Sequence, residues 1–166
     1  REQNMLTLET KEYGTLEYEP EYCINFPDGI FGFPDLHQYL PLCLNDEEDN
    51  TLLVMQSVDD PHIGFVVINP FILDRDYNPV LTPEELQYLE AESENDLTFY
   101  VICVLKNNYR ENTVNMKCPL VVNPETRRGM QVILNDSIYD FRQKLNSFAV
   151  FSEENMENAD TATEKK

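Results

Sequence analysis

The chain has 166 residues, the size of one domain, and 42% of them are hydrophobic, so it can bury a sizeable core. Asp and Glu number 31 against 12 Lys and Arg, which gives a formal net charge of -19. Such a surface repels nucleic acid and anionic membranes and attracts basic partners. No apolar run is long enough to cross a membrane, and no signal peptide is expected.

Composition predicts a folded domain over residues 5–151 and a polar tail over residues 152–166. The tail has no aromatic residue and no periodic apolar face, so we expect it to be disordered. Residues 1–4, REQN, precede Met5, which we expect to be the natural start of the chain.

Most of the domain has the pattern of short strands. Residues 6–10 and 13–19 alternate apolar and polar side chains, as half-buried strands do. Apolar runs of strand length follow at 39–44, 51–58, 63–68, 97–105, 113–122 and 130–135. The run 97–105 is expected to be a fully buried strand. We predict an all-β fold, a compact antiparallel β-barrel-like domain, because closure leaves no strand edge unpaired.

One or two short helices are expected within this β domain. Residues 82–92 give the clear signal, with Thr82 as the N-cap, Pro83 in the first helical position and Glu85 completing a capping box. Short helical turns are also predicted at 34–39 and at 139–145.

The cysteines predict free thiols. None belongs to a C-x-x-C pair, which argues against a zinc ribbon or a redox motif. Each lies in or beside an apolar run, as expected for buried thiols in a reducing compartment. They are Cys23, Cys43, Cys103 and Cys118.

The segment DDPH, residues 59–62, puts two carboxylates and an imidazole between two predicted strands. As a metal site or a hydrolase centre, Asp59, Asp60 and His62 would supply at most three ligands, and neighbours on a strand point to opposite faces. Two carboxylates acting as acid and base need different environments, which a solvated turn does not give. We favour a turn in which Asp59 or Asp60 accepts backbone N–H groups and Pro61 fixes φ.

Catalytic signatures are missing from the rest of the sequence. There is no G-x-S-x-G motif and no Gly-rich phosphate loop. We therefore predict no catalytic residue, no cofactor and no metal, and we interpret the chain as a binding protein and not as an enzyme.

Two loop segments have two interpretations each. Arg127 and Arg128, in PETRRGMQ, could grip a carboxylate or phosphate, but a charged turn between two strands is favoured. The segment FPDGIFGF crowds four large apolar residues around two glycines, as a core plug or as an outward contact patch, with the core favoured. These residues are Phe26, Ile30, Phe31 and Phe33.

Several blocks of the sequence occur in the order found in one known family. They are INFPDGIFGFPDLHQYLPL, MQSVDDPHIGFVVINPF, LTPEELQYL and VNMKCPLVVNPETRRGMQVILNDSIY. The patterns F-P-x-G-I-x-G-F, Q-S-V-D-D-P and N-P-x-T-R-x-G-x-Q within them are specific. On these blocks the chain resembles the FliW family of bacterial flagellar assembly factors over residues 6–140.

The resemblance implies a compact β-barrel-like fold, no enzymatic activity and a cytoplasmic protein that is monomeric when free. It also implies two protein partners in turn. One is CsrA, a small dimeric RNA-binding regulator that represses flagellin translation, and the other is flagellin, which captures the protein and frees CsrA.

We expect the partner-binding residues to be acidic and apolar loop residues, without an assignment of loops to partners. The expected residues are Ile30, Phe31, Phe33, Glu47, Glu48, Asp59 and Asp60. The alternative is an unrelated acidic binding protein that mimics nucleic acid, which would bind many basic proteins with strongly salt-dependent affinity.

Overall fold

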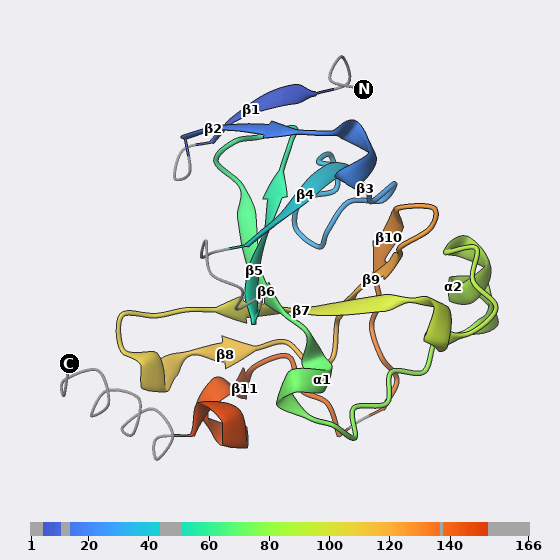
Figure 1. Ribbon diagram of the computed structural model, residues 1–166. Helices are drawn as coiled ribbons and strands as arrows, with labels where there is room; N and C mark the ends of the chain where they lie inside the picture. The colour runs from blue at the N-terminus through green and yellow to red at the C-terminus, as the bar shows by residue number, and fades with distance from the viewer. Residues whose placement is uncertain (1–4, 11–13, 44–50, 137, 153–166) are drawn as a thin grey trace.

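The computed structural model describes residues 5–10, 14–43, 51–136 and 138–152. Seven strands close into a barrel in the order β7-β6-β5-β4-β3-β10-β9, and the pairing of β9 with β7 completes the ring (Figure 1). The barrel strands are β3 (Ile24–Asn25), β4 (Gln38–Cys43), β5 (Leu52–Ser57), β6 (Gly64–Ile68), β7 (Thr98–Val104), β9 (Leu120–Asn123) and β10 (Arg128–Gln131). The predicted all-β, barrel-like fold is confirmed.

Pairing in the barrel is antiparallel except at one seam. There β10 runs parallel to β3, with Arg128 opposite Asn25. Two strands extend the sheet beyond β7, namely β8 (Thr113–Val114) and β11 (Gln143–Lys144). A separate hairpin is made of β1 (Leu6–Thr10) and β2 (Gly14–Tyr18).

Alternation along the strands divides the apolar side chains between two faces. On β7, Tyr100 and Ile102 face the barrel interior, whereas Phe99, Val101 and Cys103 face a second core outside it. The interior cluster also contains side chains of β3, β4, β5, β6 and β9, because successive residues of a strand point to opposite sides. Along β7 buried side chains alternate with partly buried ones and Val104 at its end is exposed, so the prediction of a fully buried strand over 97–105 was wrong.

The barrel interior is filled partly by a loop. Residues 26–36, called the plug loop below, send Phe26 and Ile30 among the strand side chains. Phe26 is 0% exposed and meets the Tyr39 ring edge to face, with centroids 5.4 Å apart. Gly129 of β10 makes room for this ring, since a Cβ there would lie 2.8 Å from it. The favoured interpretation of this segment as a core plug is confirmed for these two residues.

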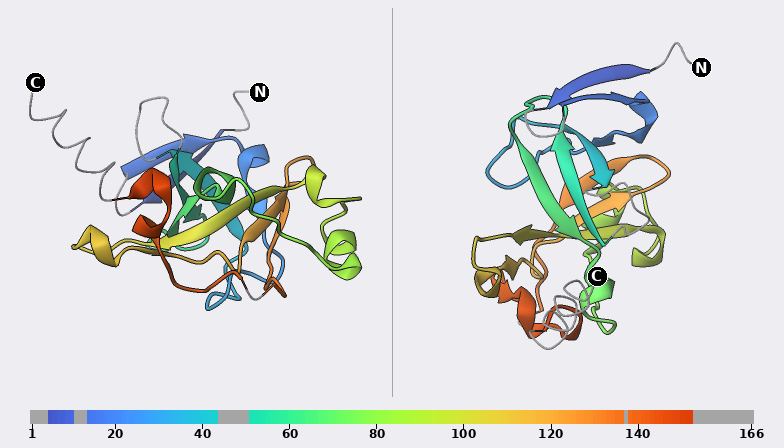
Figure 2. Two further views of the ribbon diagram at one scale, coloured as in Figure 1. Left: turned by 90° about the horizontal axis from the view of Figure 1, so that it is seen from below. Right: turned by 60° about the vertical axis from the view of Figure 1, so that its left-hand side comes forward.

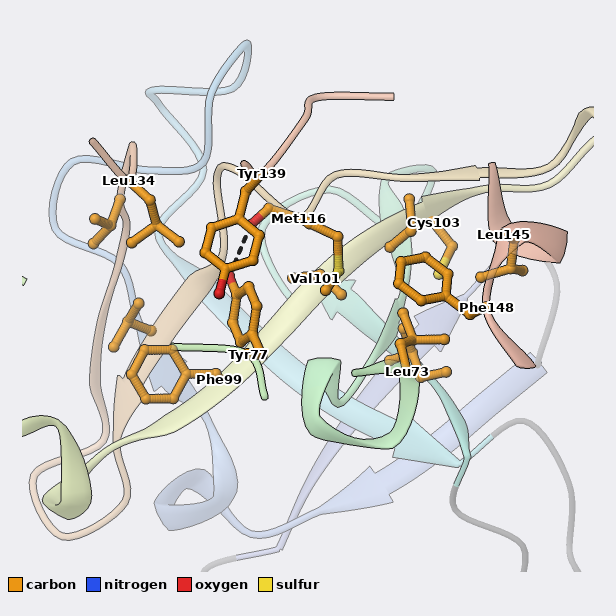
Figure 3. Packing of buried hydrophobic residues seen from close by; sticks show 14 of the residues in the cluster. Leu73, Tyr77, Phe99, Val101, Cys103, Met116, Leu134, Tyr139, Leu145 and Phe148 are labelled. Atoms are coloured by element: carbon orange, nitrogen blue, oxygen red, sulfur yellow. Dashed lines mark hydrogen bonds between the residues drawn. The ribbon is translucent and has the colours of Figure 1, made fainter. Parts of the chain in front are cut away.

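The second core lies between the outer face of β7 and β9 and the segments that cover it. Leu73 of α1 (Pro70–Leu73) and the C-terminal residues Leu145 and Phe148 pack on this face (Figure 3). The Tyr77 hydroxyl donates to the Met116 carbonyl at 2.8 Å, so its buried oxygen is satisfied (Figure 3).

The N-terminal hairpin covers the barrel at the opposite end from α1 and β11, as Figure 1 and the right-hand view of Figure 2 show. Leu8 and Tyr18 of the hairpin pack on Leu40 of β4. Among the described residues there are also five 3-10 turns: η2 (Pro20–Tyr22), η3 (Glu94–Asp96), η4 (Tyr109–Glu111), η5 (Leu145–Ser147) and η6 (Ala149–Phe151).

The helix predicted from the capping box is confirmed as α2 (Pro83–Tyr88), where Thr82 and Glu85 make both reciprocal bonds. The turn predicted at 34–39 was wrong, because residues 38 and 39 already belong to β4. At 139–145 the chain instead forms β11 and then enters η5. The run 113–122 is two strands, β8 and β9, and α1 was not predicted although Asn69 caps it.

None of the four cysteines is in a disulfide within the described residues, as predicted, but Cys43 is exposed and Cys23 is half-buried. Burial raises the pKa of Cys103 to about 12. Within the described ranges no helix is long and apolar enough to span a membrane.

The thiols should react in order of exposure. Cys43 should be alkylated by N-ethylmaleimide at about pH 8, because thiolates react and its thiol is accessible. Cys103 should stay unmodified until denaturant is added, because burial holds it as the protonated thiol. Mass spectrometry of the labelled peptides measures both rates, and equal rates in the native protein would contradict the assigned burial.

Tyr39→Phe should stabilise the protein at neutral pH by about 1 kcal/mol, because among the described residues the buried Tyr39 hydroxyl has no hydrogen-bond partner. Burial and then the charge of Asp59 raise the pKa of Tyr39 from 10.0 to about 12. The unfolded chain therefore loses this proton first, so wild-type stability should fall as pH rises from 10 to 12. Denaturant titrations should show a smaller fall for the variant, and an identical fall would contradict this.

Candidate protein-interaction site

The plug loop turns one aromatic ring outward at the mouth of the barrel. The Phe33 N–H donates to the Ile30 carbonyl at 2.7 Å across a tight turn. Gly32 has a φ of 91°, the positive value that a type II turn requires at its third residue. Ile30 is therefore 2% exposed, whereas Phe31, next in the turn, is 52% exposed.

Two further contacts fix this turn in place. The Phe31 N–H donates to Gln131 Oε1 at 2.9 Å, while Gln131 Nε2 donates to the Cys118 carbonyl at 3.0 Å. Gly29 has a φ of 73°, and a Cβ there would collide with the Phe33 carbonyl and with Pro34. Phe31 is thus held out by a backbone with little freedom, which lowers the entropic cost of a contact through its ring.

The DDPH segment is a turn whose carboxylates accept backbone bonds. Asp59 Oδ2 accepts from the N–H groups of His37 at 2.8 Å and Gln38 at 3.1 Å, which ties the β5–β6 turn to the start of β4. Asp60 Oδ1 accepts from the His62 N–H at 3.0 Å. The favoured interpretation of this segment as a polar turn is confirmed.

The metal-site alternative has little geometric support in the described part of the chain. There, no three His, Cys, Asp or Glu side chains are gathered closely enough to hold a metal ion. The ring of His37 lies with Nδ1 3.1 Å from the Phe26 carbonyl, on the plug loop.

Carboxylates gather around the DDPH turn. Burial is the largest cause that raises the pKa of Tyr18, followed by the charges of Cys23 and Asp59. Burial also raises the pKa of Cys23, against a lowering effect of Arg127 and with a smaller raising effect of Asp59. Asp59 therefore lies near the segment that joins β2 to β3. That segment carries Glu19 and Glu21, and a hydrogen bond between these two carboxyls raises the pKa of Glu19. We define the acidic face as Glu19, Glu21, Asp59 and Asp60.

Arg127 and Arg128 both contact other parts of the protein. Arg127 Nη2 donates to the Tyr22 carbonyl at 2.6 Å, and Arg128 stacks over the Tyr88 ring at 4.3 Å from its centroid. The Tyr88 hydroxyl in turn donates to Asp28 at 2.9 Å. These contacts fasten the β9–β10 turn to η2 and α2, so the charged-turn interpretation fits better than a ligand clamp.

A groove of about 800 Å³ opens beside Phe31 at the barrel mouth. Its apolar wall consists of Phe31, Ile102, Val104 and Phe141. Its polar lining residues are Lys106, Glu111, Thr113, Asn115, Gln131 and Arg142. The apolar and polar lining residues together are called the mouth groove below.

The expected partner-binding residues lie in different parts of the structure. Ile30 is inside the barrel and offers no surface, and Phe33 is half-buried with its ring 5.4 Å from that of Phe65. Phe31 belongs to the mouth groove, whereas Asp59 and Asp60 belong to the acidic face. The remaining two expected residues, Glu47 and Glu48, lie outside the described residues.

Sequence reasoning missed the mouth groove. Its residues come from the plug loop, β7, β8, β10 and the segment before β11, and only barrel closure brings them together. One available signal was the clustering of cations at 106–117 and 142–144 in an otherwise acidic chain.

Known proteins resemble this chain in sequence and in fold. The sequence model described as "FliW protein" matches residues 7–145. The flagellar assembly factor FliW of Caldanaerobacter subterraneus subsp. tengcongensis is 38% identical over 134 residues, covering 81% of this chain and 89% of the relative. The FliW of Clostridium tetani is 33% identical over 150 residues, covering 90% and 99%.

A crystal structure of the flagellar assembly factor FliW superposes with a TM-score of 0.76 at 31% identity, covering 84% of this chain and 96% of that one. Both the sequence and the barrel fold of this chain therefore match those of FliW proteins over most of the described residues. The chain belongs to the FliW family of flagellar assembly factors.

Proposed function

We propose that this flagellar assembly factor is a cytoplasmic regulator that acts by exchanging protein partners. It binds the translational regulator CsrA and antagonises its repression of flagellin mRNA, and cytoplasmic flagellin in turn titrates it. The observation that carries the CsrA half is the acidic face, in a chain with a net charge of -19.

Charge gives the first step of this function. An RNA-binding regulator must present a basic surface to phosphates, and an acidic partner is steered to such a surface at a rate that falls with salt. Glu21 and Asp59 are exposed, and their backbone is fixed by η2 and by the bonds of the DDPH turn. The acidic face is thus a preorganised partner for a basic protein.

Repulsion gives the second step. A strongly negative protein bound beside an RNA site lowers RNA affinity without occupying that site, because like charges are brought together. The switch then depends on the difference between the affinities for CsrA and for flagellin. An acidic mimic of nucleic acid remains the competing interpretation, since the same charge would serve it.

Neutralising the acidic face should weaken CsrA binding by roughly tenfold, because the variant loses several charge pairs that each contribute modestly to the binding free energy. Amides are the right replacements, because Asp59→Asn and Asp60→Asn keep oxygens that accept the N–H groups of the turn. Charge reversal at Asp59 would break these bonds and disturb β4. The test variant combines these two changes with Glu19→Gln and Glu21→Gln, and calorimetry measures the affinity.

A matched control removes the same charge elsewhere. It carries Asp76→Asn after α1, Glu84→Gln within α2, and Glu90→Gln and Glu92→Gln after α2. The control should keep nearly wild-type affinity for CsrA at about 0.1 M salt, where distant charges are screened. Equal weakening in both variants would show that net charge alone acts, as a nucleic-acid mimic requires.

Flagellin should displace CsrA from this protein. Size-exclusion chromatography of the protein with CsrA should first show a complex, and added flagellin should move the protein to a new complex while CsrA elutes alone. Persistence of the CsrA complex at excess flagellin would contradict the titration half of the proposal. No complex with either partner would contradict the whole of it.

A further inference from the structure

Cations are concentrated on one part of this acidic protein. Segments 104–117 and 138–148 carry five of the chain's 12 Lys and Arg but few carboxylates. The cations are Lys106, Arg110, Lys117, Arg142 and Lys144, and the carboxylates are Glu111 and Asp140. Elsewhere carboxylates outnumber cations heavily, so this part of the surface has the opposite sign to the rest.

Strand pairing brings these two segments together at the mouth groove. β11 pairs with β8, with Lys144 opposite Thr113, and Lys144 Nζ donates to the Arg110 carbonyl at 3.3 Å. Lys106 and Arg142 line the groove directly. Within the described residues, neither of their side chains makes a hydrogen bond or an ion pair. Their charges therefore face the groove unpaired, and the Glu111 carboxylate shares its lining.

The groove also offers apolar anchors. Phe31 and Phe141 are each 52% exposed and both line it, as do Val104 and Ile102. Phe31 is held rigidly by its turn, and Lys117 Nζ lies 5.9 Å from the centroid of the Phe141 ring. Rigid aromatic anchors beside cations have the composition of an interaction hot spot.

We propose that the mouth groove docks an acidic amphipathic segment of a partner protein, with apolar side chains between Phe31 and Phe141 and carboxylates on Lys106 and Arg142. CsrA, the basic partner, suits the acidic face and is repelled by the cations of the mouth groove. The acidic segment therefore belongs to the second partner of the proposed exchange, flagellin. That a second partner exists rests on the proposed function, whereas the chemistry of the docked segment is inferred from the residues that line the groove.

A synthetic amphipathic peptide tests the groove directly. The probe has leucines at helical spacing i, i+3, i+4 and i+7 and glutamates elsewhere, with a fluorophore at its N-terminus. A second probe has lysines in place of the glutamates. Fluorescence anisotropy with the full chain should show binding of the acidic probe that Lys106→Gln with Arg142→Gln weakens by about tenfold.

Two matched comparisons make the result specific. Phe141→Ser should also weaken the acidic probe, whereas Arg75→Gln removes an exposed cation after α1 and should leave the affinity unchanged. The lysine probe should be insensitive to the groove variants. An acidic probe that does not bind, or that binds the double groove variant as tightly as wild type, would overturn the proposal.

The chain's own polar tail is the competing occupant. Residues 153–166 lie outside the described residues and carry Glu153, Glu154, Glu157, Asp160 and Glu164. The full chain with these five changed to amides should bind the acidic probe as wild type does. If the probe binds only this variant, the groove belongs to the tail, and the assignment to a partner is overturned.

Failure of this inference is distinguishable from failure of the proposed function. The double groove variant should still bind CsrA normally, since the acidic face is unchanged. Loss of CsrA binding in this variant would show that the two partners share the groove, which overturns the inference. Normal probe binding without any CsrA binding would instead contradict only the proposed function.

Discussion

Phe26 inside the barrel, packed against Gly129, is the contact on which the exposed surfaces depend. A seven-stranded barrel must be filled by side chains, and β3 contributes only two residues to it. The plug loop supplies the missing volume, and a glycine opposite the ring makes the space. Once Phe26 and Ile30 are inside, the turn between Ile30 and Phe33 must project Phe31 outward. The exit of the loop is tied to the DDPH turn by Asp59, so one packed loop positions both the mouth groove and part of the acidic face.

The two surfaces have opposite chemistry, which fits the proposed exchange of two protein partners. The acidic face consists of carboxylates on fixed turns and suits a basic RNA-binding protein. The mouth groove combines aromatic anchors with Lys106 and Arg142 and suits an acidic segment. The plug loop contributes Phe31 to the groove and its last residues adjoin the DDPH turn, so it offers a physical route by which one partner can affect the other. The stability of the protein and its binding geometry are therefore linked through the same residues.

The sequence predicted those features that depend on local chemistry. The capping box of Thr82 and Glu85 predicted α2, and alternation predicted the strands β1 and β2. The DDPH turn followed from the preference of Asp and Pro for such positions. Features set by closure were not predictable: Ile30 and Phe31 are neighbours of similar character, and only the type II turn decides which is buried. The mouth groove brings together Phe31 and Phe141, which are 110 positions apart in the chain, and no local pattern predicts that both line one groove.

Hydrogen–deuterium exchange of this protein, alone and with CsrA, tests most directly that the two surfaces are separate and chemically distinct. We predict slower amide exchange in residues 17–23 and 57–63, around the acidic face, with segments 104–117 and 138–148 unchanged. Slower exchange in the mouth-groove segments with no change around Asp59 would contradict it, because CsrA would then occupy the surface assigned to an acidic partner.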